Sequence, residues 1–335
     1  MPSNTIFEKG DKQLVTELMN GAFVGELYDD YITVVSEYSP FRTQPGVTKY
    51  TFPNLTAINR EGAGAPGSAS GFQNCANLEE VVAPNLRNLN FGFTNCTSMR
   101  RANFPLVQID TGATSVFSGC SSLVDVNLDS ATRLPVNAFT SCASLENIEL
   151  PSVVNVGTSN GSSAVFSYCT SLRRVYLPSA TTIYGTANSS HLPFNYCGAI
   201  EILRFPSWTG SNELANQTAN ISMKLYDAGL TTTLPGNAIS RFVRYTKILI
   251  LRKTDAVTTL GSATSFTAGT TPTPIKVYVP SALISSYETA TNWSTVLANN
   301  YVEFRALEGS RFEDPDFDDA DIYNANRDAL DALLY

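Results

Sequence analysis

Short stretches in which apolar and polar residues alternate recur along much of the chain. In the stretch 147–151, Ile148 and Leu150 alternate with polar residues, and Pro151 follows. A period of two is typical of a β-strand with one buried face, so this pattern predicts a half-buried strand. Because proline cannot donate a hydrogen bond to a neighbouring strand, Pro151 marks the end of the pairing.

Each alternating stretch follows a fixed signature, in which a phenylalanine precedes a cysteine by three residues and the cysteine precedes an apolar residue by three. The six cysteines are 21 to 28 residues apart. The predicted core positions are Phe72, Cys75 and Leu78; Phe93, Cys96 and Met99; Phe117, Cys120 and Leu123; Phe139, Cys142 and Leu145; Phe166, Cys169 and Leu172; and Phe194, Cys197 and Ile200. A pattern with this period predicts a repeat solenoid, mostly strand and loop, with one parallel β-sheet and short helices at the ends.

The cysteines are expected to form a column of buried free thiols. In-register stacking places successive Cβ atoms ~4.8 Å apart, which is more than the ~3.5–4.5 Å that a disulfide requires. Metal binding is disfavoured because there is no C-x₂-C pair and the single histidine, His191, lies outside the column. We therefore expect no metal and no cofactor.

The pattern divides the chain into four segments. Residues 1–46 carry no repeat and are interpreted as an N-terminal cap or attachment segment. Residues 47–206 hold the repeats, beginning with a unit without cysteine. Residues 207–309 are interpreted as degenerate repeats and a C-terminal cap, and residues 310–335 as an acidic linker followed by a docking helix.

The last segment carries most of the net charge. Nine acidic and two basic residues lie in 308–335, a balance of −7 out of −8 for the whole chain. Like charges are expected to keep a linker at 313–321 extended. The apolar residues beyond it recur at helical spacing and are candidates for docking a partner, another copy or a virion protein: Ile322, Ala329, Leu330, Leu333 and Leu334. The alternative is that this helix packs back on its own solenoid.

Two surfaces of the solenoid are candidates for recognition. The outward strand positions Lys49, Glu80, Arg101 and Asp125 alternate in sign, which indicates a self-satisfied, solvated face more than a docking site. The insertions 61–71, 157–165 and 185–193 fall at the same point of the repeat, so they line one edge. Tyr184 and His191 near the last insertion are candidate ligand-binding residues; the alternative is that the loops are spacers.

Several classes of function lack support in the sequence. There is no basic stripe for nucleic acid, no apolar run of ~20 residues for a membrane span, and no secretory signal at the start. No recognisable catalytic constellation is present, so we expect no enzyme. Asp314, Asp316 and Asp318 are spaced like part of a calcium loop, but the required glycine and glutamate are missing.

The repeat unit resembles the BspA-type leucine-rich repeat. The ending ILILRKTDAVTTLG (248–261), IKVYVPSALISSYETATNWS (275–294) and FRALEG (304–309) is similar to that of leucine-rich repeat proteins of gut bacteria and their phages. The resemblance implies a non-enzymatic binding protein. The lack of a secretory signal favours a virion component (tail, baseplate or capsid-decorating), made in the host cytoplasm, that binds a host-surface glycan or protein. The alternatives are a bacterial surface adhesin and an intracellular interaction scaffold.

Overall fold

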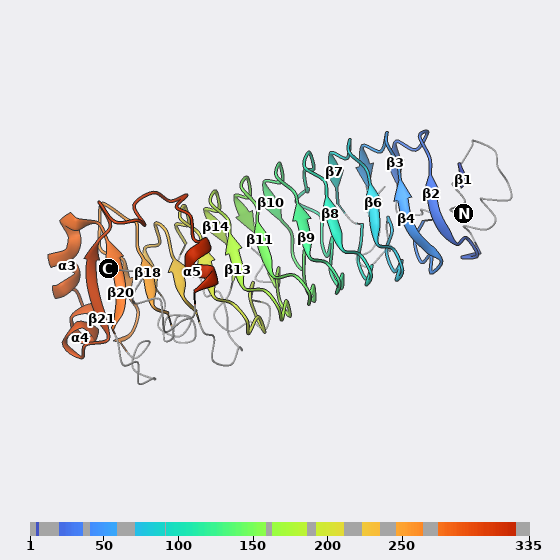
Figure 1. The fold of residues 1–335 in the computed structure, drawn as a ribbon. Coiled ribbons are helices and arrows are strands. Elements are labelled where there is room, and N and C mark those ends of the chain that lie inside the picture. Colours follow the sequence, from blue (N-terminus) through green and yellow to red (C-terminus); the bar gives the residue numbers. More distant parts are fainter. Residues whose placement is uncertain are drawn as a thin grey trace.

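The chain folds into an elongated solenoid whose coils are stacked along one axis (Figure 1). The computed structural model describes residues 5–6, 20–35, 41–58, 71–90, 92–158, 163–185, 192–210, 223–234, 246–263 and 274–325. All strand pairs in these ranges are parallel. The predicted parallel solenoid is confirmed.

One long row of strands forms the main sheet face. Its strands are β1 (Thr5–Ile6), β2 (Gly25–Tyr28), β4 (Val47–Thr51), β6 (Glu80–Val82), β8 (Arg101–Asn103), β9 (Asp125–Asn127), β11 (Asn147–Glu149), β13 (Arg174–Tyr176), β15 (Ile202–Arg204), β16 (Leu225–Asp227), β18 (Ile248–Ile250), β20 (Ile275–Val279) and β21 (Val302–Ala306). The alignment of outward positions is confirmed, because Lys49 pairs with Glu80 and Arg174 with Ile202.

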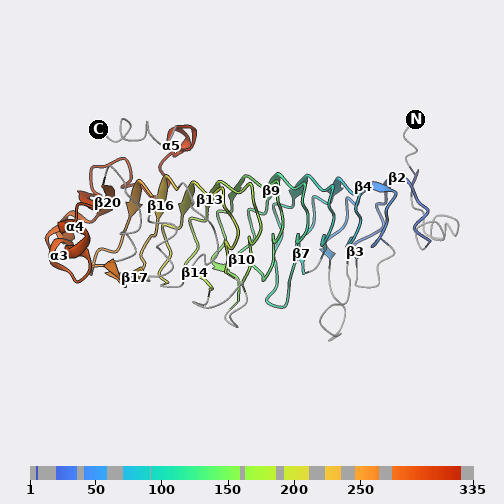
Figure 2. The same ribbon diagram turned by 90° about the horizontal axis from the view of Figure 1, so that it is seen from below.

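A second row of two-residue strands lies on the opposite face, where a single sheet was predicted (Figure 2). These strands are β3 (Val34–Val35), β5 (Ala57–Ile58), β7 (Asn88–Leu89), β10 (Arg133–Leu134), β12 (Asn155–Val156), β14 (Thr182–Ile183), β17 (Thr233–Leu234) and β19 (Thr259–Leu260). The turn after each proline reverses the chain, and the next inward residue, such as Val156, is fully buried. The prediction missed this row because two residues are too few to show alternation.

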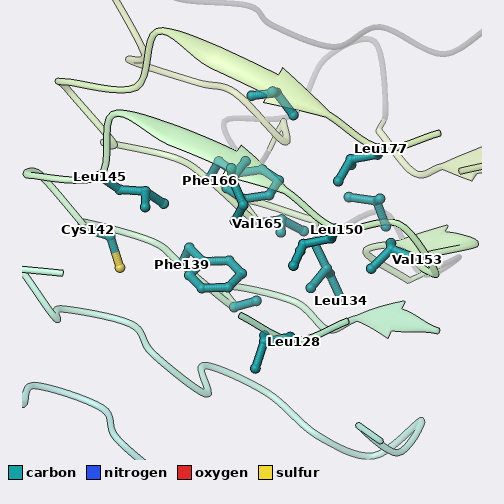
Figure 3. Close-up of a cluster of buried hydrophobic side chains, with 14 of the residues drawn as sticks. Leu128, Leu134, Phe139, Cys142, Leu145, Leu150, Val153, Val165, Phe166 and Leu177 are labelled. Carbon is teal, nitrogen blue, oxygen red and sulfur yellow. The ribbon is translucent and has the colours of Figure 1, made fainter. Parts of the chain in front are cut away.

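Equivalent side chains of successive coils form continuous columns in the core. The rings of Phe139 and Phe166 stack with centroids 5.5 Å apart and an angle of 1° between their planes. Phe93 and Phe117 stack in the same way at 5.3 Å and 1°. Every phenylalanine, cysteine and apolar residue of the six predicted units is fully buried. Figure 3 shows Phe139, Cys142 and Leu145 pointing into this core.

The repeats begin earlier than the predicted boundary at residue 47. Phe41 stacks on Phe72 at 6.0 Å, and Gln44 takes the place of the cysteine three residues later. Gln44 is buried, and its main-chain N–H lies 3.4 Å from Sγ of Cys75. β2 also pairs with β4, so the described part of the segment interpreted as a cap contains coils of the solenoid itself.

Beyond residue 206 the coils continue without the phenylalanine and cysteine columns. The register is fixed by Ile202 pairing with Leu225, and Leu225 with Ile248. A short helical cap follows β20, made of the 3₁₀-helix η3 (Ser281–Leu283), α3 (Ile284–Thr289) and α4 (Trp293–Ala298). The Trp293 indole donates to the oxygen of Thr258 at 2.7 Å, which ties the cap to the preceding coil.

After β21 the chain turns back over the main sheet. Residues 310–324, here called the strap, end in helix α5 (Ala320–Asn324). Figure 2 shows α5 on the side of β13 and β16, away from β14 and β17. The strap therefore lies against the outer face of the sheet, and the prediction of an extended linker is wrong for these residues.

Candidate functional site

The cysteine column is a structural element whose thiols bond to the main chain. The Cys120 thiol donates to the oxygen of Phe93 at 3.0 Å, and the Cys197 thiol donates to that of Phe166 at 2.9 Å. The same contact, one coil back, is made by Cys75, Cys96, Cys142 and Cys169. All six cysteines are free, and all six are buried, as predicted.

The thiols are poorly suited to nucleophilic chemistry. Burial raises the pKa of Cys120 and of Cys197 to about 12, and that of Cys75 to about 11. The thiolate is the reactive form of cysteine, so these groups stay protonated and inert at neutral pH. Within the described ranges, no group of three or more His, Cys, Asp or Glu side chains is arranged to hold a metal ion.

The open half of the sheet face carries exposed ion pairs. Lys49 Nζ lies 2.8 Å from Glu80, and Arg101 Nε lies 3.8 Å from Asp125. Hydrogen bonding to Glu80 raises the pKa of Lys49. Exposed pairs of this kind contribute ~0–1 kcal/mol each and leave little net field. The expectation of opposite charges in adjacent strands is met on this half of the sheet.

The other half of the sheet face is covered by the strap through buried charges. Asp319 accepts hydrogen bonds from Arg174 Nε at 2.8 Å and from Arg204 Nη1 at 2.7 Å. Arg204 Nη2 also donates to the oxygen of Pro315 at 2.6 Å. The side chains of Arg204 and Asp319 are 1% and 4% exposed, so this pair is removed from water. Removing either member of a buried ion pair is strongly destabilising, because it leaves the other charge buried without a partner.

Further contacts of the same kind run along the strap. Lys224 Nζ donates to the oxygen of Tyr323 at 2.7 Å, and Arg252 Nη1 donates to that of Glu313 at 3.1 Å. The Tyr176 hydroxyl bonds to Asp316, and burial is the main cause that raises the pKa of Tyr176. Cations of the sheet therefore hold the acidic strap along its length.

Beneath the strap lies a second apolar cluster, which is separate from the main core. Outward residues of the sheet contribute Ile202, Leu225, Ile248, Ile250 and Tyr278, and the chain that crosses them contributes Leu307, Phe312, Phe317 and Ile322. The Arg204 guanidinium also lies 3.9 Å from the centre of the Phe317 ring. The face is thus both apolar and cationic where the strap binds.

This arrangement changes the interpretation of the C-terminal docking residues. Ile322 is fully buried in the second cluster, so in this structure it packs against its own solenoid, which was the alternative in the sequence analysis. Ala329, Leu330, Leu333 and Leu334 lie outside the described residues. Acidic residues do not keep the strap extended, because Asp319 pairs with Arg174 and Arg204 of the sheet and Asp321 pairs with Arg311 of the strap itself.

A pair of tyrosines stands out on the turn that leads into the main sheet. The residue before each cysteine, and the residue before Gln44 in the coil without a cysteine, has a positive φ. This position is usually held by small or polar residues: Thr43, Asn74, Asn95, Gly119 and Ser141. In two consecutive coils it is tyrosine, with φ of 63° at Tyr168 and 61° at Tyr196. The left-handed region is unfavourable for a bulky residue, and such strain is concentrated at functional sites.

The two rings stack on one another at the surface. Their centroids are 4.5 Å apart, the angle between the rings is 16°, and the residues are 48% and 37% exposed. The main-chain N–H of Tyr168 donates to the oxygen of Asn195 at 2.9 Å, which fixes the turn in its left-handed form. Tyr168 and Tyr196 each lie three residues after the end of an insertion, 157–165 and 185–193 respectively.

The candidate ligand residues of the loop edge are described only in part. Tyr184 is half-buried, and its oxygen accepts a hydrogen bond from Ser163 Oγ at 2.5 Å, which closes the base of the insertion before Phe166. His191 lies outside the described residues, as does much of each insertion. The structure adds Tyr168 and Tyr196 to this edge.

The stacked parallel coils and the core columns define the chain as a parallel β-solenoid. Comparison with protein families gives the type: residues 68–201 match six copies of the BspA type leucine-rich repeat region. This part of the chain therefore consists of BspA-type leucine-rich repeats.

Among solved structures, the chain is similar to a leucine-rich cell surface protein of Faecalibacterium prausnitzii A2-165. The two share 19% identity over 72% of this chain and 62% of that protein, with a TM-score of 0.31. No curated protein matches the chain. No helix in the described part of the chain is long and apolar enough to cross a membrane.

Proposed function

We propose that the protein is a non-enzymatic adhesion protein of the bacterial cell surface, which binds a glycan through its loop edge. The exposed tyrosine pair, held in a strained conformation at the base of two insertions, carries this proposal. The match to BspA-type repeats supports a binding role. The negative face of an aromatic ring attracts the partly positive C–H groups of a sugar ring, so a stacked tyrosine pair suits such a ligand.

The test compares two variants in binding to a glycan array and to immobilised host-cell glycoproteins. Replacing both Tyr168 and Tyr196 by Asn keeps a residue that tolerates positive φ and removes the rings. We expect binding to fall at least about tenfold, which corresponds to ~1.4 kcal/mol. Tyr31→Asn is the matched control, because Tyr31 is 67% exposed and lies outside the loop edge. Equal binding by the double variant and the wild type would reject the loop edge as the site.

A virion component is the second candidate. The observation in its favour is the tail pattern at 248–261, 275–294 and 304–309, which resembles proteins of gut bacteria and their phages. The match to BspA-type repeats supports a binding role in general and adds nothing for the virion component. Portal, capsid or tail genes next to the gene of this protein would favour the virion; an isolated gene or neighbouring surface-protein genes would favour the adhesin.

A further inference from the structure

The strap is bound to the sheet face in the way that a peptide ligand is bound. Across the described residues it adds no strand to the main sheet. Its polar contacts come from side chains of the face, above all Arg174, Arg204 and Tyr176, and they reach strap carboxylates and main-chain oxygens. Its apolar contacts are Phe312, Phe317 and Ile322 in the second cluster. The face therefore recognises an acidic segment with aromatic anchors.

The strap is also a compact unit with internal bonds of its own. The Arg311 guanidinium donates to Asp321 at 2.6 and 2.8 Å and to the oxygen of Asp318 at 3.0 Å. The rings of Phe312 and Phe317 meet edge to face at 5.1 Å. These contacts join its two ends without any help from the sheet. A segment that is organised before binding loses less conformational freedom when it binds.

The connection between the strap and the solenoid allows the strap to swing away. Gly309 has a φ of 73°, and a Cβ built there would meet nothing within 4 Å. The apolar cluster under the strap is distinct from the main core, so release of the strap leaves the core columns intact. Release would expose Ile202, Leu225, Ile248 and Ile250 beside the buried Arg204, and this surface then requires a new cover.

We propose that this face is a docking surface for the strap of a second copy of the chain, so that two copies join by exchanging straps. Arg174 and Arg204 pair with Asp319, and Lys224 and Arg252 donate to main-chain oxygens of the strap. The strap of another copy carries the same groups, so the face complements it equally well. Exchange of an identical element is a low-cost route to dimers, because each contact is remade in the partner. In the monomer, the short connection gives the copy's own strap an effective concentration of about millimolar. Exchange is therefore favoured where the protein is crowded.

A pair of charge-reversed full-length chains tests the exchange directly. In Arg204→Asp the altered face repels its own Asp319, and in Asp319→Arg the altered strap repels its own Arg204. Neither chain can close on itself, whereas each strap matches the face of the other chain. Sedimentation should show monomers for each variant alone. The equimolar mixture should give a species of about twice the 36.2 kDa of one chain.

The chain that carries both changes is the matched control, because its strap and face again have opposite charges. It should remain monomeric at the concentrations at which the mixture dimerises. A mixture that stays monomeric up to about 1 mM, the effective concentration provided by a short connection, would overturn the proposal. The proposal would also be overturned if either variant alone formed as much dimer as the mixture does. Such dimers would show that sheet faces without a bound strap associate with one another. If a reversed chain loses its main melting transition, Arg204→Gln and Asp319→Asn replace the pair. A less abundant heterodimer is then expected, because only one of its two interfaces regains the Arg204–Asp319 contact.

Discussion

The thiol of Cys142 donates a hydrogen bond to the main-chain oxygen of Phe117, one coil earlier, at 3.2 Å. The same oxygen accepts the main-chain N–H of Cys120, in its own coil, at 3.1 Å. Each phenylalanine oxygen from Phe72 to Phe166 therefore serves two cysteine positions. This sharing gives a physical reason for the fixed spacing: a buried residue three places after the phenylalanine can donate to the phenylalanine oxygen of the preceding coil.

The thiol column should make stability fall at alkaline pH. The folded-state pKa of Cys120 is raised from the ordinary value of 9.0 to about 12, so the unfolded chain loses protons first as pH rises. Stability is complete below pH 9 and declines above it, by up to about 1.4 kcal/mol per pH unit for each thiol. Urea melts from pH 7 to 10.5 measure this decline. In Cys142→Ala the slope should be smaller, because one thiol whose pKa is raised by burial is removed, and an unchanged slope would contradict the assignment.

Core columns should contribute far more to stability than outward positions do. Leu145 is fully buried, and Leu145→Ala should lower the free energy of unfolding by ~2–5 kcal/mol because it leaves a cavity. Asn147 is exposed, and Asn147→Ala should cost less than ~0.5 kcal/mol. Urea melts of the two variants compare the costs. Equal costs would show that the inward and outward faces have been assigned wrongly.

The core columns could be predicted from sequence because each column repeats one residue type, and that residue type is suited to a buried position. Phe139, Cys142 and Leu145 lie in the core as their spacing predicted. Phe41 and Gln44 were missed, although Phe41, Gln44 and Val47 keep the same spacing, because the cysteine served as the marker. Glutamine at this buried position still offers an amide for hydrogen bonding, so the turn is preserved. Without the cysteine, however, the repeat is not recognised in the sequence.

Arg204→Met should release the strap without melting the solenoid. The change leaves Asp319 with Arg174 as its remaining arginine partner, and breaking a buried pair costs ~3–5 kcal/mol. Hydrogen exchange of residues 311–323 should become much faster, while exchange in β11 and β13 stays slow. Arg101→Met is the control, because its exposed pair with Asp125 is worth less than ~1 kcal/mol. Slow exchange of the strap in Arg204→Met would mean that the apolar cluster alone holds it.

Removing the tyrosine pair should leave stability nearly unchanged. The left-handed conformation costs ~1–3 kcal/mol at each tyrosine, and the stacked pair returns ~0.5–1.5 kcal/mol. Replacing Tyr168 and Tyr196 by Asn removes both terms, so the melting temperature should stay the same or rise. Thermal melts monitored by circular dichroism measure it. A clear drop would show that the rings are kept for packing, which would remove the observation behind the proposed glycan site.

The strap could be predicted only in part. The sequence signal was present in β15 and β18, where outward positions become apolar at Ile202, Ile248 and Ile250. Such residues indicate that the outer face of the sheet is covered. They do not identify the covering segment, because alternation of apolar and polar residues indicates only whether each position is buried. The cover comes from Phe317 and Asp319, more than 60 residues later, and no periodic pattern connects the two segments. The tyrosines in the left-handed turn could not be predicted either, because the spacing of residues does not determine the backbone conformation of each one.

The position of the strap means that the number of coils in the solenoid can change without changing the C-terminal surface. Among the described residues, the contacts of the strap with the main sheet begin at β13, and within that part of the chain the strap does not reach the coils from β4 to β9. A whole coil in this stretch joins its neighbours through the same phenylalanine and cysteine contacts as any other. Whole coils can therefore be gained or lost in this stretch during evolution. The loop edge would then move nearer to or farther from the N-terminus, while the strapped end stays the same.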